Sequence, residues 1–165
     1  MSSPIFEKSE YLKNIKIIKI LKESAFSAHT DIVCISISKN LNSVERFKCF
    51  VKELEDSNDA IVSSMGKTTI TILLHERFLE KAKNFFSKEI LDINVKVGAI
   101  FMKCPKEVNL TPGVTALISS LFADKNVTLY ELISTYTDYV IVINEKDTYK
   151  MASYIKSILE VNYDN

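Results

Sequence analysis

The chain has 165 residues, which suit one domain or two small ones, and 47% of them are hydrophobic, which suffices for an apolar core. Lysine plus arginine and aspartate plus glutamate number 21 each, so the neutral balance argues against a nucleic-acid partner and an anionic membrane surface. No apolar run approaches the roughly 20 residues of a membrane span, and the N-terminus lacks a signal-peptide pattern, so a cytoplasmic protein is expected.

The first half of the chain has the pattern of a βαββαβ unit. It follows an N-terminal segment, residues 1–28, that is predicted to be helical over Leu12–Ser24. Runs rich in β-branched residues predict strands, and apolar residues three and four positions apart predict helices, with Asn42 or Ser43 available to cap the first of them. The predicted elements are a strand at Thr30–Ser38, a helix at Asn42–Asp56, a hairpin around Met65-Gly66, a helix at Arg77–Ile90 and a strand at Leu91–Cys104.

The second half repeats this order. Its predicted elements are a strand at Gly98–Cys104, a helix from Thr111 to Phe122, a hairpin of Val127–Thr135 and Tyr139–Asn144, a helix at Asp147–Glu160 and a weak last strand at Val161–Asn165. The fold class expected is therefore α+β, with two tandem ferredoxin-like βαββαβ units that have antiparallel sheets and helices on one face. The expected domains are an N-terminal helical segment at 1–28, a first unit at 29–97 and a second unit at 98–165.

A second interpretation of the first half stays open. If residues 12–54 were helical throughout, they would include a helix-turn-helix, and the chain would be a DNA-binding regulator with a C-terminal sensor domain. The density of β-branched residues in Asp31–Ile37 argues against a helix there. Whether Thr30–Ser38 is strand or helix distinguishes the two interpretations.

The segment Asn109–Phe122, NLTPGVTALISSLF, places a Pro-Gly pair before five apolar residues at helical spacing. Thr111 is predicted to be the N-cap of this helix and Pro112 its first residue, where a missing N–H costs nothing. The N–H groups of Gly113–Thr115 then have no partner inside the helix and carry the positive end of its dipole. A well-formed helix start explains these residues, but backbone donors beside a glycine can also bind a carboxylate.

The stretch TPGVTALISSLFADKNV and the hairpin ELISTYTDYVIV resemble an ACT domain, the small ligand-binding module of amino-acid metabolism, over about Val97–Leu159. They are similar to the ACT pairs of aspartate kinases and, more closely, to the arginine-sensing CASTOR-type proteins. The corresponding stretch of the first half, SKNLNSVERF, has neither Pro nor Gly. The first half therefore has the fold pattern without the ligand turn.

The resemblance implies an amino-acid site at the junction of two ACT units, where the turn before the first helix of one unit faces the second strand of its neighbour. Backbone N–H groups of the turn would bind the α-carboxylate. Strand carbonyls and the hydroxyl of Ser134 or Thr135 would bind the ammonium group, and Glu131 would add charge if it points inward. The residues carried over are Asn109, Leu110, Thr111, Pro112, Gly113, Val114 and Thr115 in the turn, and Glu131, Leu132, Ile133, Ser134 and Thr135 in the strand.

The remaining chemistry-bearing residues form no recognisable motif. His29 and His75 lie far apart in the sequence, and Cys34, Cys49 and Cys104 form no CxxC pair. The stretch SSMGKTT lacks the earlier glycine of a phosphate-binding loop. We therefore predict no catalytic residue, no metal ligand and no cofactor.

Together these features predict a non-catalytic, amino-acid-binding regulatory or sensor protein built from tandem ACT domains. We expect it to be a homodimer, formed through sheet edges or helices, that changes its association with a partner protein when the ligand binds. Neither a nucleic acid nor a membrane is expected as a partner. Besides the DNA-binding alternative, a scaffold that only forms an oligomer through its ACT-like sheets stays open.

Overall fold

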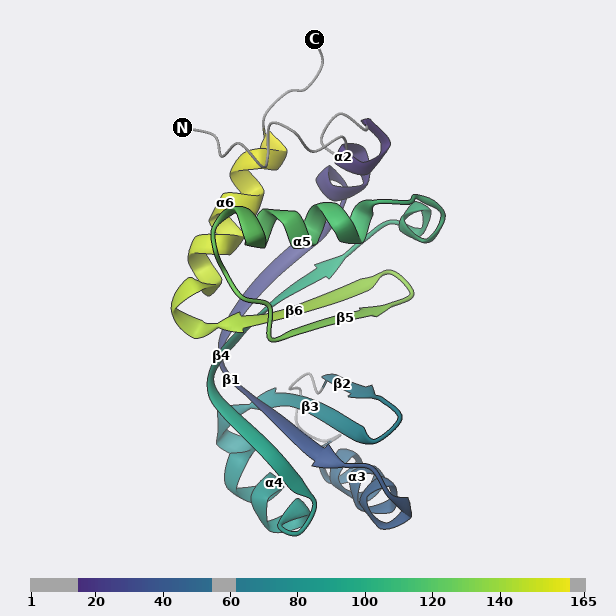
Figure 1. The fold of residues 1–165 in the computed structure, drawn as a ribbon, viewed down its shortest axis with the longest axis vertical. Helices are drawn as coiled ribbons and strands as arrows, with labels where there is room; N and C mark the ends of the chain where they lie inside the picture. The colour runs from purple at the N-terminus through teal and green to yellow at the C-terminus, as the bar shows by residue number, and fades with distance from the viewer. Residues whose placement is uncertain (1–14, 55–61, 161–165) are drawn as a thin grey trace. The chain divides into compact units, whose positions relative to one another are not determined.

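The computed structural model describes residues 15–54 and 62–160 (Figure 1). Their contacts form two compact units. Residues 15–30 and 98–160 belong to one, which we call the split unit, and the described residues of 31–97 belong to the other, which we call the inserted unit. Both boundaries fall inside long strands, β1 (Ala25–Ser38) and β4 (Ile90–Lys103), so each of these strands contributes to both units. The sequence predicts consecutive segments, whereas residues 15–30 here group with residues 98–160.

The inserted unit contains four strands in the order β2-β3-β1-β4 and helices on one face of its sheet (Figure 1). Strand β3 pairs antiparallel with β1, from Ile32 opposite His75 to Ser38 opposite Thr69, and also antiparallel with β2. Alternate apolar side chains of β1 and β3 pack against both helices. The remaining elements are α3 (Leu41–Leu54), β2 (Val62–Met65), β3 (Thr69–His75), the 3₁₀ turn η2 (Glu76–Phe78) and α4 (Leu79–Phe86).

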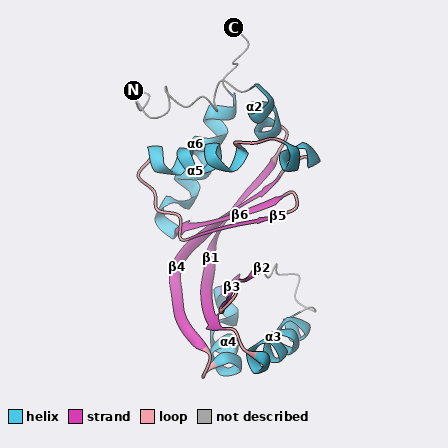
Figure 2. Ribbon diagram, turned by 45° about the vertical axis from the view of Figure 1, so that its right-hand side comes forward, coloured by secondary structure: helices cyan, strands magenta, loops and turns pink. Residues whose placement is uncertain are grey.

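The split unit has the strand order β1-β4-β6-β5 and carries its helices on one face of the sheet (Figure 2). Strands β5 and β6 form an antiparallel hairpin, from Glu131 opposite Val142 to Thr135 opposite Asp138. Its core joins alternate residues of β6 to the apolar faces of the three helices. The remaining elements are α2 (Ile15–Lys22), the 3₁₀ turn η3 (Lys106–Leu110), α5 (Val114–Asp124), β5 (Glu131–Thr135), β6 (Asp138–Asn144), the 3₁₀ turn η4 (Glu145–Asp147) and α6 (Thr148–Glu160).

Both units have the strand order of a ferredoxin-like sheet. In the inserted unit, β1, β2, β3 and β4 are the first, second, third and last strands of the motif. In the split unit β4 is the first strand, and the N-terminal half of β1 occupies the place beside it that the last strand of the motif takes. The predicted last strand at Val161–Asn165 lies outside the described residues.

The stretch Thr30–Ser38 is part of strand β1, so the helix-turn-helix interpretation is wrong. Val33, Ile35 and Ile37 are almost fully buried. These buried side chains recur at every second residue, which is the repeat of a strand and not that of a helix. Of the predicted N-terminal helix, Ile15–Lys22 is helical, and Leu12–Asn14 lies outside the described residues.

Helix α3 is capped by Asn40, not by Asn42 or Ser43, so that prediction is wrong. The Oδ1 of Asn40 accepts a hydrogen bond from the N–H of Ser43 at 2.9 Å, and the Oγ of Ser43 accepts one from the N–H of Asn40 at 2.9 Å. This reciprocal capping box sets the start of α3 at Leu41 and makes Ser43 its partner inside the first turn.

Within the described part of the chain, none of the helices combines the length and the apolar character that crossing a bilayer requires.

Candidate functional site

The loop that leads from β4 to α5 is anchored to the tip of the β5–β6 hairpin. The N–H of Cys104 donates a hydrogen bond to the carbonyl of Thr137 at 2.8 Å. Beside it, the Lys103 Nζ lies 2.7 Å from the Asp138 Oδ1, although both side chains are about half exposed. An exposed ion pair contributes little stability, so the backbone bond is the firmer of the two anchors. The start of the loop is therefore held against the hairpin.

The Cys104 thiol is a packing group. Its side chain is buried, and this burial raises its pKa. The Asp138 carboxylate also raises that pKa, while a hydrogen bond with Ser24 and the Lys103 ammonium group lower it. A thiol with a raised pKa keeps its proton at neutral pH and is a poor nucleophile.

The predicted N-cap at Thr111 is wrong, because its hydroxyl is used by the preceding turn. The Thr111 Oγ1 donates to the carbonyl of Glu107 at 2.9 Å, which closes the 3₁₀ turn η3. Gly113 is the N-cap, with φ 95° and ψ −9°, and α5 begins at Val114. This left-handed conformation is easily adopted only by glycine, and it turns the chain sharply into the helix. Pro112 thus lies before the cap.

This geometry leaves the backbone donors at the start of α5 outside the helical ladder. The first intrahelical bond runs from the N–H of Leu117 to the carbonyl of Gly113 at 2.9 Å, so the N–H groups of Val114–Ala116 precede it. The cap residue has no side chain, and no cap hydrogen bond forms within the described residues. In α3, by contrast, the side chain of the cap residue Asn40 accepts a hydrogen bond from the N–H of Ser43 in the first turn. The two helix starts thus differ in chemistry.

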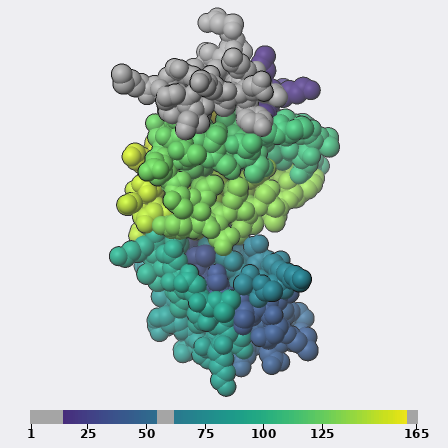
Figure 3. All heavy atoms as spheres, in the orientation of Figure 1, coloured from purple at the N-terminus to yellow at the C-terminus, as the bar shows by residue number. Residues whose placement is uncertain are grey.

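Strand β5 is brought close to this helix start through β6. The Thr115 Oγ1 lies 3.0 Å from the hydroxyl of Tyr139, and Tyr139 is directly opposite Ser134 in the hairpin. Opposite residues on one face of an antiparallel pair have Cβ atoms about 4.5–5.5 Å apart. Ser134 therefore lies next to Tyr139, on the face that α5 covers. Figure 3 shows α5 in green and the hairpin in yellow-green, adjacent at the surface.

Glu131 is separated from this place within the split unit. It pairs with Val142, at the end of the hairpin away from the turn. Glu131 is three positions before Ser134, and because successive side chains alternate between the two faces of a strand, it faces the opposite side of the sheet. Thr115 of the turn and Ser134 of the strand thus both lie next to Tyr139, whereas Glu131 does not.

The predicted residues divide by exposure. Val114 and Ile133 are buried, so only their backbone atoms can face a ligand, and Leu110 is 86% exposed. Thr111, Gly113, Glu131 and Leu132 are half-buried, and Asn109, Pro112, Thr115, Ser134 and Thr135 are exposed.

A groove of about 420 Å³ lies between α2 and the turn. Leu110 and Thr111 line it from the predicted turn, and the other lining residues come from α2 and η3: Lys16, Lys19, Ile20, Glu23 and Glu107. The sequence pattern gives no sign of these residues or of Tyr139, because their positions depend on how α2 packs and on the hairpin register. Among the described residues, no group of three or more His, Cys, Asp and Glu side chains is placed to hold a metal ion.

No protein-family model and no curated protein sequence matches the chain. Its fold, however, matches solved structures. The regulatory subunit of aspartate kinase from Thermus thermophilus, in a ligand-free form, is 10% identical with a TM-score of 0.62, and the match covers 82% of this chain and 97% of that one. The aspartate kinase from Synechocystis is 12% identical with a TM-score of 0.67, and the match covers 86% of this chain and 27% of that one.

A protein of unknown function from Vibrio cholerae, described as a possible transport protein, is 11% identical with a TM-score of 0.59, and the match covers 88% of this chain and 97% of that one. The chain thus spans nearly the full length of separate regulatory subunits and about a quarter of the Synechocystis kinase. The predicted fold class is confirmed: the chain has the α+β fold, with antiparallel sheets, of the regulatory ACT pairs of aspartate kinases.

Proposed function

We propose that this chain is a non-catalytic regulatory or sensor protein that binds a free amino acid at the start of α5. The α-carboxylate is bound by the N–H groups of Val114–Ala116, and the ammonium group by carbonyls and hydroxyls of a second-strand segment, Ser134 and Thr135, from a neighbouring ACT unit. The match to regulatory subunits of aspartate kinase supports a regulatory role.

The observation that carries this proposal is the difference between the two helix starts. In α3, the Asn40 side chain accepts from the N–H of Ser43 in the first turn, and the Ser43 hydroxyl accepts from the N–H of Asn40 at the cap, so an incoming anion would have to displace them. In α5, the cap is a glycine at φ 95° and supplies no side chain. Free donors at the positive end of a helix dipole attract a carboxylate, with a contribution of about 0.3–1 kcal/mol from the dipole at an exposed site.

Ligand binding regulates by selecting among arrangements of ACT units. If the carboxylate is bound by one unit and the ammonium group by another, the ligand binds more tightly when the two are correctly placed, and it stabilises that arrangement. A homodimer supplies such a neighbouring unit. The output is a changed association with a partner protein, in a cytoplasmic setting.

Isothermal titration calorimetry of the full chain against each of the twenty amino acids, up to millimolar concentrations, tests the proposal. We expect heat from one amino acid or a small group of them. The amide of the same amino acid, which lacks the carboxylate charge, should bind at least about tenfold more weakly, because hydrogen bonds to a charged group contribute about 1.5–3 kcal/mol. An absence of binding to all twenty would overturn the proposal.

A pair of matched variants locates the site. Ser134→Val on β5 should weaken binding about tenfold, since it removes a hydroxyl from an exposed strand position. Ser63→Val makes the same change at an exposed position of β2, the corresponding strand of the inserted unit, and should leave binding unchanged. Equal affinities for both variants would place the ligand elsewhere.

A further inference from the structure

The split unit has a second groove, of about 490 Å³, between the start of β1 and α6. Its apolar wall is made of the partly buried Ala28 and Ala152 and the buried Leu159, and Phe26 lines it with 38% of its surface exposed. The short side chains of Ala28 and Ala152 leave space that larger side chains would fill. A concave volume of this size with an apolar wall suits a ligand of several residues.

One wall of this groove is a free strand edge. Strand β3 pairs with β1 only from Ile32 to Ser38, so among the strands of residues 15–54 and 62–160 none pairs with Ala25–Thr30 on the side away from β4. Asp31, with φ 56°, has a left-handed backbone conformation within the strand, one residue before that pairing begins. The stretch Ala25–Thr30 contains no proline, lysine or acidic residue, which are the usual protections of a strand edge. On the side away from β4, its N–H and C=O groups have no strand partner within residues 15–54 and 62–160 and are available to another strand.

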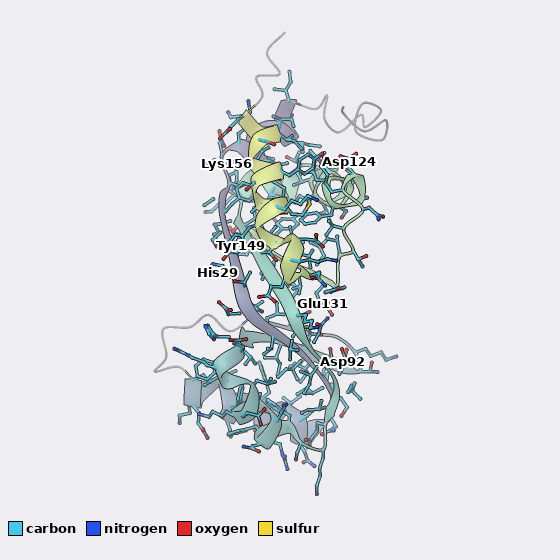
Figure 4. The ribbon with its side chains drawn as sticks, turned by 90° about the vertical axis from the view of Figure 1, so that its left-hand side faces the viewer. His29, Asp92, Asp124, Glu131, Tyr149 and Lys156 are labelled. Atoms are coloured by element: carbon cyan, nitrogen blue, oxygen red, sulfur yellow. The ribbon has the colours of Figure 1, made fainter. Side chains whose placement is uncertain are left out.

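The other wall is helix α6, which runs beside β1 (Figure 4). Lys156 lines the groove from α6, and Lys22 lines it from the end of α2. At the far end, the hydroxyls of Thr30 and Tyr149 lie 3.5 Å apart and join the two walls. Among the described residues, Lys22 and Lys156 line the groove against one acidic residue, Glu160, which gives this lining a net positive charge. This charge favours an acidic occupant.

We propose that this groove binds an extended, acidic peptide segment of a partner protein, which adds a strand to the free edge of β1. Main-chain hydrogen bonds along Ala25–Thr30, about 20 Å of strand, provide affinity, and side chains that alternate along the peptide provide specificity. An apolar side chain packs against Ala28 and Ala152, and acidic side chains lie toward Lys22 and Lys156. A second copy of this chain fits less well, because pairing two β1 edges would bring like-charged lysines together.

Panning a phage-displayed library of random octapeptides against the full chain tests this proposal. We expect enriched peptides to alternate apolar and acidic residues. A synthetic, fluorescently labelled copy of an enriched peptide should bind in an anisotropy titration, and methylating its backbone nitrogens at alternate positions should abolish binding in one of the two registers. Loss in one register identifies strand pairing.

Three variants locate the peptide. Ala152→Leu fills the groove and Lys156→Glu reverses its charge, and each should raise the Kd at least tenfold. Lys150→Glu, which makes the same charge change on α6 outside the groove lining, should leave the Kd unchanged. If Ala152→Leu fails to fold, Lys156→Glu, at an exposed position, still decides the matter.

The proposal is overturned by a library that yields no enrichment, or by a peptide whose affinity both groove variants leave unchanged. It is also overturned if sedimentation equilibrium finds a dimer that Lys156→Glu changes and Lys150→Glu does not, because the edge would then belong to a second copy.

Discussion

The substitution Gly98→Ala tests how closely α6 packs on the sheet of the split unit. A Cβ at Gly98 would overlap the Oγ1 of Thr148, the first residue of α6, and would lie 3.0 Å from the Thr148 Cβ and 2.9 Å from the carbonyl oxygen of His29. Thr148 is fully buried, and the His29 oxygen belongs to a strand backbone that cannot rotate away. Overpacking costs about 1–3 kcal/mol, and because two neighbours must move we expect about 3 kcal/mol.

A double-mutant cycle separates this clash from other effects. Thr148→Ala alone removes a hydroxyl that donates to the Asn144 carbonyl at 3.3 Å, at a cost of about 1 kcal/mol. In its presence, Gly98→Ala should cost at least about 1 kcal/mol less than in the wild type, since the overlapping atom is gone. Urea unfolding of the four proteins, followed by circular dichroism, measures these values. An unchanged midpoint for Gly98→Ala, or costs that simply add, would refute the reasoning.

Three further predictions concern the loop, the first cap and the thiol. Gly113→Ala should lower the free energy of unfolding by about 1–2 kcal/mol because φ is 95°, and Gly113→Asn, which tolerates this region, should lower it less in the same urea assay. Asn40→Ala should cost about 1 kcal/mol and leave amino-acid binding unchanged, as thermal unfolding and calorimetry would record. Burial raises the pKa of the Cys104 thiol, so the stability that the protonated thiol provides is complete at neutral pH and is lost as the pH rises above about 8.5. Above that pH, the urea midpoint should fall less steeply with pH in Cys104→Ala than in the wild type. Equal slopes of midpoint against pH in the two proteins would contradict this.

Most elements of the fold could be predicted because their periodicity is local. Ile70 and Ile72 of β3 alternate into the core, and the helix that contains Met151 and Ile155 repeats at helical spacing. Strand partners could not be predicted in the same way. That β1 extends back to Ala25 and completes a sheet with β4 depends on residues far away in the sequence. Propensity at Ala25–Thr30 carries no such information.

The loop of the candidate site was predictable in place but not in geometry. A Pro-Gly pair before an apolar helix indicates a helix start, yet it does not reveal that Gly113 adopts a left-handed conformation and becomes the cap. Likewise, the contact of Thr115 with Tyr139 depends on the two-residue turn at Tyr136-Thr137, where Tyr136 has φ 54°. A different turn length would shift the register and place another residue opposite Ser134.

The difference between the two helix starts also sets the expected stoichiometry of the proposed amino-acid site. At α3, a carboxylate would have to displace the Asn40 and Ser43 side chains, whose hydrogen bonds are each 2.9 Å long and each contribute about 1 kcal/mol. At α5, no side-chain cap of Gly113 has to be displaced. A difference of about 2 kcal/mol is roughly thirtyfold in affinity, so the chain should bind one amino acid and not two at concentrations that saturate the first site. Calorimetric stoichiometry checks this, and two equal sites per chain would show that capping does not decide where the ligand binds.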